Sequence, residues 1–299
     1  QMSPKTLLNF GYRAETTSSS RKDNGNYQDW TSHHTTQHQG FVQLEYLHDE
    51  LRFNASLGLV MASSDLNTNL RSYLEPALGI IWQTEQAGEF SIALGRNIAF
   101  PTMRQLFSFE HGNPDLRAQT ALKTELGHKI PMRVLNRDLA LGSSFFYNST
   151  HGLIDEYQGV YQNLDQVESW GTEISLLVKA TNWLEFDFNY NWLDHLGKNG
   201  YHLTESPEHS AELFARLDLP WRMKLSLNGF YQGNRLSEDS SFNLRELEAY
   251  WVYNLQVQRT WEKFRIYAGL ENIMDRNYAS EWGYPGAGRN FNLGLELKI

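Results

Sequence analysis

The sequence alternates between apolar and polar residues, with a period of two, along most of its length. The pattern is clearest at the end of the chain, where the apolar positions are Phe291, Leu293, Leu295, Leu297 and Ile299. Strict alternation over about ten residues matches a tilted transmembrane strand that shows one face to lipid and the other to a lumen. The pattern therefore predicts strands in a sheet that separates two environments.

The alternation recurs in residues 51–61, 184–192, 211–219, 221–227, 251–257 and 264–270. It assigns to the lipid face Leu57, Phe188, Leu225, Leu255, Ile266 and Leu295. It assigns to the lumen face Glu125, Glu173, Asp187, Lys224 and Glu271. About fourteen strands are predicted in all, an even number as in bacterial single-chain barrels. No stretch of comparable length has a helical period.

The predicted connections alternate between short and long. Short ones are predicted at residues 48–50, 84–88, 180–182, 218–221 and 260–263, with a somewhat longer one at 131–137. Long ones are predicted at residues 17–36, 63–69, 99–119, 150–159, 193–208, 233–246 and 275–288. Short periplasmic turns and long extracellular loops are typical of outer-membrane barrels. We therefore expect residues 1–299 to form one antiparallel all-β barrel domain in outer-membrane lipid, with both termini periplasmic.

The composition agrees with this class. A mean hydropathy of -0.54 is low for a membrane protein, but only every second residue of a barrel strand faces lipid. The sequence contains no cysteine, which suits passage through the oxidising periplasm. The net charge of -9 argues against a nucleic-acid partner. A soluble β-sandwich that binds sugars through exposed aromatic residues is the alternative from another fold class.

Two segments carry motifs of a known family. The first comprises Leu94–Pro101, Leu106–Phe107, Gly112–Leu116 and Glu125–Gly127. The second comprises Leu270–Tyr278, Gly283–Gly286 and Gly288–Arg289. In order and spacing they resemble the C-terminal barrel portion of TonB-dependent outer-membrane receptors. The resemblance implies uptake of a scarce nutrient such as a siderophore or a corrinoid.

Members of that family carry a plug domain inside a barrel of about 22 strands. We expect no plug domain in this chain, which leaves three readings: part of a receptor, a reduced barrel that closes alone, or a barrel whose plug is a separate chain. The functional alternatives are a plugless barrel that anchors or encloses a partner protein, and a diffusion pore. Mixed charges on the predicted lumen face favour a lumen filled by a partner segment or by inward-folded loops, above all residues 99–119 and 275–288.

The motif-bearing loops supply the candidate ligand-binding residues. These are His111, Asn113, Asp115, Tyr284 and Arg289. His111 lies between motifs where haem-uptake receptors of the family place a haem-binding histidine, so haem is one candidate ligand. Ile98-Ala99 departs from the expected Phe-Arg there, and an ordinary loop histidine is the other reading. Asn113-Pro114-Asp115 is also a turn-forming triplet with a purely structural reading.

A second group of histidines lies in the first predicted loop. His33, His34 and His38 have a spacing that suits a soft metal ion. No cysteine or neighbouring pair of carboxylates completes the site, so polar loop histidines are the alternative interpretation. No segment resembles a nucleophile elbow or another catalytic signature. The chain is therefore not expected to be an enzyme, and no cofactor is expected.

Overall fold

A computed structural model describes the chain except for residues 1–4, 23–29, 66–70, 198–202 and 298–299. Ile299, the last apolar position of the alternation, lies outside the described residues, as do parts of the loops predicted at 17–36, 63–69 and 193–208. None of the described helices combines the length and apolarity needed to cross a bilayer.

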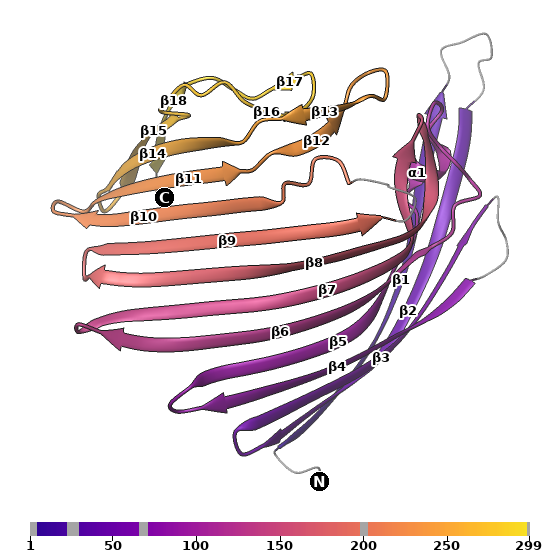
Figure 1. Ribbon diagram of the computed structural model, residues 1–299, viewed down its shortest axis with the longest axis horizontal. Helices are drawn as coiled ribbons and strands as arrows, with labels where there is room; N and C mark the ends of the chain where they lie inside the picture. The colour runs from indigo at the N-terminus through magenta and orange to yellow at the C-terminus, as the bar shows by residue number, and fades with distance from the viewer. Residues whose placement is uncertain (1–4, 23–29, 66–70, 198–202, 298–299) are drawn as a thin grey trace.

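Fourteen strands form one antiparallel sheet in which sequence neighbours pair (Figure 1). They are β1 (Thr6–Lys22), β2 (Trp30–His48), β3 (Leu51–Ser64), β4 (Arg71–Thr84), β5 (Gly88–Ala99), β6 (Gln119–Val134), β7 (Arg137–Tyr157), β8 (Val160–Thr181), β9 (Leu184–Gly197), β10 (His209–Leu219), β11 (Met223–Gln232), β14 (Tyr250–Thr260), β15 (Phe264–Glu271) and β18 (Asn290–Leu297). The prediction of about fourteen antiparallel strands is confirmed.

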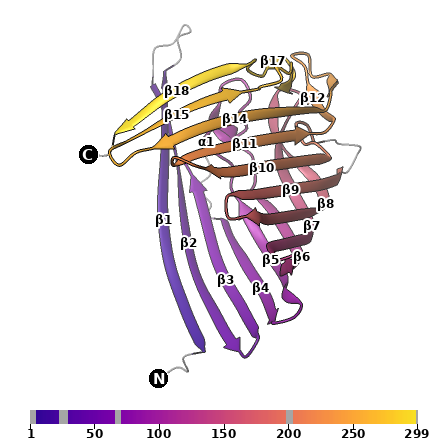
Figure 2. The same cartoon turned by 90° about the vertical axis from the view of Figure 1, so that its left-hand side faces the viewer.

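The sheet is strongly curved, with β1 and β18 as its outermost strands (Figure 2). Within the described residues, β1 pairs only with β2, and β18 pairs only with β15. Phe10 on β1 is 83% exposed, because no further strand covers this edge. An edge of this kind exposes unpaired backbone donors and acceptors.

Rows of directly paired residues show how the two faces differ. One row crosses β2 to β7 through Tyr46, Phe53, Ile80, Ile92, Leu126 and Phe145. These apolar side chains are between 38% and 49% exposed. The opposite face carries the row Ser91, Gly127, Ser144, Glu173, Asn191, Ser210 and Gln232 across β5 to β11. Apolar exposure on one face and polar groups on the other are what a lipid-facing barrel wall requires.

The connections at one end of the sheet are tight turns (Figure 1). The turn between β6 and β7 contains only Leu135 and Asn136, both with positive φ, as in the turns that match the twist of a hairpin. The somewhat longer connection predicted at residues 131–137 is therefore wrong. The strands simply continue to the turn, because its two residues accept the left-handed conformation.

Two predicted loops are largely strand. Residues 17–36 were expected to form a loop, but β1 continues to Lys22 and β2 begins at Trp30. Hydroxyl pairs bridge the two strands, Thr16 with Thr36 at 3.2 Å and Ser20 with Ser32 at 2.8 Å. A strand that lies outside the membrane needs no apolar face, and threonine is common in strands. The polar sequence of this hairpin therefore lacks the alternation from which strands were predicted.

The second case is the loop predicted at residues 150–159. Here β7 runs to Tyr157 and β8 begins at Val160, which leaves only Gln158 and Gly159 in the turn. Both turn residues have positive φ. The hairpin thus extends beyond the apolar part of the strands, where the alternation that marks a strand in the sequence has ended.

Candidate ligand-binding loops and the concave face

A hollow of about 610 Å³ lies on the concave side of the sheet. Seven neighbouring strands, β5 to β11, contribute to its lining, and small or polar residues such as Gly127, Ser144 and Ser175 form much of it. The carboxylates of Glu173 and Glu212 also line it. Asn191 Oδ1 is buried there and accepts no hydrogen bond within the described residues. Buried polar atoms are almost always satisfied, so this acceptor is an exception within the described residues.

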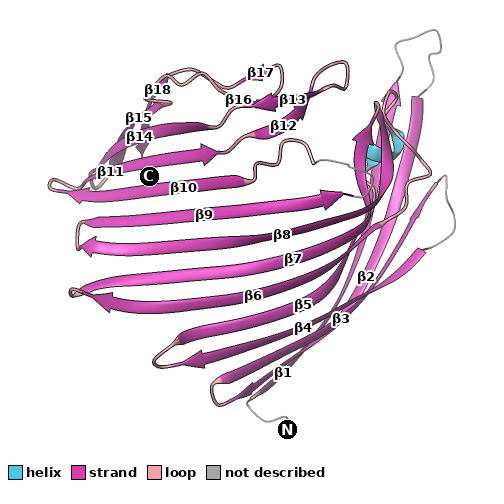
Figure 3. Ribbon diagram, viewed as in Figure 1, coloured by secondary structure: helices cyan, strands magenta, loops and turns pink. Residues whose placement is uncertain are grey.

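The connection from β5 to β6 folds inward against β1 to β4. It contains α1 (Met103–Phe107), the short helix shown in cyan in Figure 3, whose N-terminus is capped by a Thr102–Gln105 capping box. The Phe107 ring stacks on His33 at 4.2 Å between centroids, and Phe100 meets Tyr73 edge-on at 5.7 Å. This is the inward folding expected for residues 99–119.

His111 ties this connection to the β7–β8 hairpin. Its Nδ1 donates to the carbonyl oxygen of Gly159 at 2.7 Å and lies 3.1 Å from the Glu156 carboxylate. Its own carbonyl oxygen accepts from the backbone N–H of Tyr161 at 2.9 Å. With Nδ1 held in this way, only Nε2 remains for a ligand such as haem, and it lies 3.5 Å from the Glu110 carboxylate. His111 is therefore a bridging residue between two loops in the described structure.

Asn113 has a similar role, and Asp115 differs from it. Asn113 Nδ2 donates to the carbonyl oxygen of Tyr161 at 2.9 Å, and its Oδ1 accepts from the backbone N–H of Asp115 at 3.0 Å. The second bond is the local turn that an Asn-Pro-Asp triplet favours. The Asp115 residue itself is exposed. Of the three candidates in this connection, Asp115 is thus the one whose side chain faces solvent.

Tyr284 and Arg289 lie in the other motif-bearing connection, between β15 and β18. Asn272, only 2% exposed, closes this connection by donating from Nδ2 to the carbonyl oxygens of Arg276 at 2.9 Å and Ala287 at 3.0 Å. The backbone N–H of Arg289 donates to Asp275 Oδ1 at 2.9 Å. Tyr284, on the short β17 (Tyr284–Pro285), is 66% exposed. The motif residues therefore shape the connection, and Tyr284 is presented outward.

The three candidate metal-binding histidines do not converge. His33 and His34 are adjacent on β2, so their side chains point to opposite faces of the sheet. His33 Nδ1 lies 2.8 Å from Asp65 Oδ2, and His38 Nδ1 lies 2.6 Å from the Tyr12 hydroxyl. Across residues 5–22, 30–65, 71–197 and 203–297, no group of three or more potential ligands is close enough to hold a metal ion.

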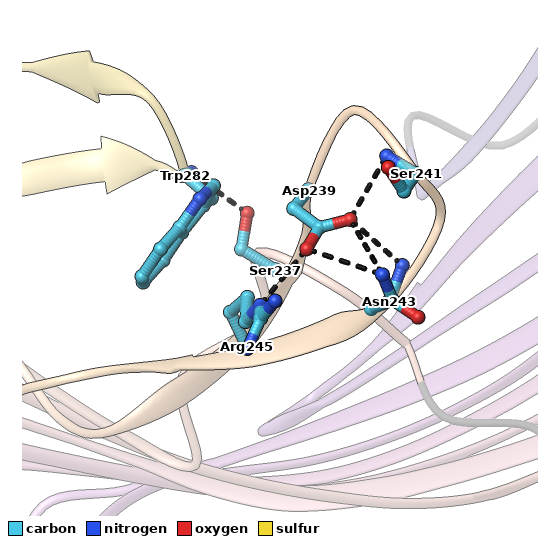
Figure 4. A network of polar contacts seen from close by, with 6 residues as sticks. All are labelled: Ser237, Asp239, Ser241, Asn243, Arg245 and Trp282. Carbon is cyan, nitrogen blue, oxygen red and sulfur yellow. Dashed lines mark hydrogen bonds and ion pairs between the residues drawn. The ribbon is translucent and has the colours of Figure 1, made fainter.

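A polar network that the sequence did not reveal joins three further connections. Figure 4 shows the part of it that links the β12–β13 hairpin to Trp282. It is built on the hairpin of β12 (Arg235–Glu238) and β13 (Leu244–Leu247). The fully buried Ser237 hydroxyl donates to the Glu205 carboxylate at 2.7 Å and accepts from the backbone N–H of Trp282 at 2.8 Å. Trp282 follows β16 (Ala279–Glu281). The only sequence signal was a polar stretch within a predicted loop.

Arg235 and Asp239 hold the same hairpin at its two ends. The buried Arg235 guanidinium donates to the carbonyl oxygens of Ala279 and Ser280. At the tip, Asp239 accepts from the backbone N–H groups of Ser241 at 2.9 Å and Asn243 at 3.0 Å, and from Arg245 Nε at 2.9 Å (Figure 4). These hydrogen bonds lower the pKa of Asp239 to about 2.

The fold and these motif-bearing connections agree with a sequence comparison. Residues 3–273 match the family described as TonB dependent receptor-like, beta-barrel. The chain belongs to this family. Its members are receptor and transport barrels of the outer membrane rather than enzymes, which confirms the recognition and the expected class.

Among curated relatives, an iron-regulated outer membrane virulence protein of Vibrio cholerae is 23% identical over 330 residues. The match covers 97% of this chain and 49% of that protein, and a second strain carries a protein matched to the same extent. The receptor chain therefore spans about half the length of the curated relatives that it matches.

Solved structures show the same fold at low identity. The FrpB iron transporter of Neisseria meningitidis superposes with a TM-score of 0.80 at 13% identity, over 99% of this chain and 52% of that chain. The copper transporter OprC gives 0.79 at 14% identity, over 98% and 54%. The ferripyoverdine receptor of the Pseudomonas aeruginosa outer membrane gives 0.70 at 14% identity, over 91% and 40%.

Proposed function

We propose that this chain forms the ligand-capturing part of an outer-membrane uptake receptor for a scarce metal-containing nutrient, such as a ferric siderophore or a corrinoid. The proposal rests on the long connections at one end of the sheet, which hydrogen bonds join into one loop assembly. Its parts are linked through His111 to Gly159, Ser237 to Glu205, and Arg235 to Ala279. The relatives' names, which refer to iron regulation and to iron or copper transport, support a metal-containing cargo.

The concave face favours an occupied lumen over an open diffusion pore. Its hollow is lined by the carboxylates of Glu89, Glu173 and Glu212 together with Lys129. A plug, from the same protein or from a separate chain, would bring donors to this face. A partner protein enclosed by the barrel would meet the same chemistry, and it is the second candidate function. Leaving such groups without partners is costly, so water alone is the weaker explanation.

The open edges support completion of the sheet by further strands. In lipid every backbone polar group needs a partner, so an uncovered edge is not stable in the hydrocarbon region. The first residues of β1 and the last of β18 lie at the end of the sheet that carries the short turns. Because short turns face the periplasm in outer-membrane barrels, we propose that both termini are periplasmic.

Uptake of radiolabelled iron complexes by cells under iron limitation tests the proposal. We expect deletion of the gene to abolish uptake of one class of complex. Replacing residues 279–287 with a glycine–serine linker should have the same effect without loss of the protein from the outer membrane. Glu262→Gln, in a short turn between β14 and β15, is the matched control. Normal uptake by the linker variant would contradict capture by this assembly.

Planar-bilayer conductance separates the remaining functions. An occupied receptor is expected to pass little steady current. A large, steady open-channel current from the purified protein would instead support a diffusion pore. A partner protein that co-purifies at fixed stoichiometry, together with normal iron uptake in the deletion strain, would support the anchoring function.

A further inference from the structure

An open groove of about 370 Å³ lies on the outer side of the sheet, opposite to the concave face and beside the long connections. Gln232 belongs to the polar row of the concave face, so Tyr231 and its strand partner Trp251 point to the outer side. The volume is within the range of about 300–1,000 Å³ that small-molecule sites have. We call this site the aromatic groove, and it is lined mainly by Tyr231, Ala249, Trp251, Tyr253, Met274 and Arg276.

The aromatic groove lies at the depth of the lipid headgroups. Trp251 and Trp261 are ten residues apart on β14 and its continuation, which is about 33 Å along an extended strand. With a strand tilt of about 40°, this length spans about 25 Å, the height of the apolar band of outer-membrane barrels. The two tryptophans therefore mark the two membrane interfaces, and the groove belongs to the interface beside the long connections.

Three aromatic rings form one wall of the groove. The ring of Trp251 lies 5.2 Å from that of Tyr231 and 5.5 Å from that of Tyr253 between centroids, and it is parallel to Tyr253 within 5°. Gly229 leaves room for this wall, because a Cβ atom there would lie 2.8 Å from Cε1 of Tyr253. Rings with an apolar body and a polar edge suit the boundary between headgroups and acyl chains.

A guanidinium stands beside the aromatic wall. The backbone of Arg276 is fixed by the buried Asn272, which accepts from the Arg276 N–H at 2.8 Å and donates to its carbonyl oxygen at 2.9 Å. The Arg276 guanidinium lies 3.9 Å from the carboxylate of Glu248. This ion pair is weak, since the contact is long and the Glu248 side chain is 92% exposed. Arg276 is therefore free to bind a phosphate without breaking a strong pair.

We propose that the aromatic groove binds one molecule of the phosphorylated glycolipid that forms the outer leaflet of bacterial outer membranes. A phosphate would bind Arg276, a sugar ring would lie against the aromatic wall, and an acyl chain would follow the apolar face toward Leu255. Basic pockets beside a membrane-facing surface bind anionic headgroups in this way. The assignment to the outer leaflet rests on the periplasmic position of both termini under the proposed function.

Native mass spectrometry measures the site directly. The full chain is purified from outer membranes, freed of lipid in mild detergent, and titrated with bisphosphorylated lipid A or with phosphatidylglycerol. We expect the parent protein to retain one lipid A molecule and to bind phosphatidylglycerol more weakly, because the phospholipid lacks the sugar rings. Equal or tighter binding of phosphatidylglycerol would overturn the glycolipid as the occupant.

Substitutions at Arg276 provide the decisive comparison. Arg276→Gln should raise the dissociation constant for lipid A about tenfold, because a charge-assisted hydrogen bond to the phosphate is lost. Arg276→Lys, which keeps the charge, should recover part of the affinity. Arg104→Gln removes the same charge at an exposed position on α1, away from the groove, and should bind like the parent. Equal affinity of the parent and Arg276→Gln would overturn the proposal.

Two features separate this result from other effects. All variants should migrate differently before and after boiling in detergent gels, which shows that the barrel is folded in each. Lipid binding is measured without any iron complex, so a failed uptake experiment and a failed lipid titration are distinct outcomes.

Discussion

Asn163 and Arg117 form a reciprocal pair in which a side-chain amide takes the place of a strand neighbour. The backbone N–H of Arg117 donates to Asn163 Oδ1 at 2.8 Å, and Asn163 Nδ2 donates back to the Arg117 carbonyl oxygen at 2.9 Å. Nδ2 also reaches the Gly152 carbonyl oxygen at 2.9 Å. This one side chain on β8 thus fixes the end of the α1-containing connection to the β7–β8 hairpin.

Asn163→Ala is expected to loosen that connection. The substitution leaves three backbone groups without their partners, at a cost of about 1–3 kcal/mol. Hydrogen exchange at the amides of residues 111–118 should then accelerate by about tenfold or more, while exchange in β5 stays slow. Gln162→Ala, at the neighbouring position, is the control. Unchanged exchange in the Asn163 variant would show that the connection is held by its apolar contacts alone.

The two faces of the sheet should respond differently to arginine. Leu57 is 47% exposed on the apolar face, and Ser56 beside it points to the concave face. Leu57→Arg should lower the free energy of unfolding in bilayers by roughly 2–4 kcal/mol if its position is deep in the membrane. Ser56→Arg should change it little. Equal costs for the two variants would contradict the assignment of the faces, because a shift of one residue exchanges them.

The tip of the β12–β13 hairpin should unfold in acid. Asp239 has its pKa lowered from 3.8 to about 2 by the hydrogen bonds that it accepts. Its contribution to hairpin stability is therefore present above about 3.8 and is lost as the pH falls toward 2. The protection of the amides of Ser241 and Asn243, measured as their exchange rate relative to the intrinsic rate at the same pH, should fall over this range. Asp239→Asn should show low protection of these amides with no change over this range, and a parent protein whose protection does not depend on pH would contradict the assigned role.

A row of alternating charges should fix the alignment of five strands near the short turns. Arg133, Asp138, Lys179, Glu185 and Arg216 are consecutive partners across β6 to β10. Glu185 lies 3.0 Å from Arg216, so Glu185→Lys would place three cations in sequence. We expect a loss of about 1 kcal/mol, measured by urea unfolding in bilayers, and partial recovery on adding Arg216→Glu. Failure of the second change to restore stability would argue against direct pairing.

The sequence determined the sheet because the side-chain period of a strand is a local property. Leu295 and Glu271 could be assigned to opposite faces from their neighbours alone, since a strand turns successive residues to opposite sides. The Trp221 turn and most of the other short connections were equally visible, because they interrupt the alternation for only a few residues; the turn between β6 and β7 was placed too early. Where strands continue beyond the membrane, as at Thr16 and Ser20, the alternation ends and the sequence stops marking them.

Only the tertiary structure decided how the connections meet. His111 and Gly159 are 48 residues apart, and Arg235 and Ala279 are 44 apart, so no local pattern could place them in contact. The same holds for Ser237 and Glu205, which are 32 residues apart and form a hydrogen bond only in the folded chain. Alternation assigns each residue to a face, whereas the curvature of the whole sheet brings distant connections to one end. The strands could therefore be predicted from the sequence, whereas the contacts between the long connections could not.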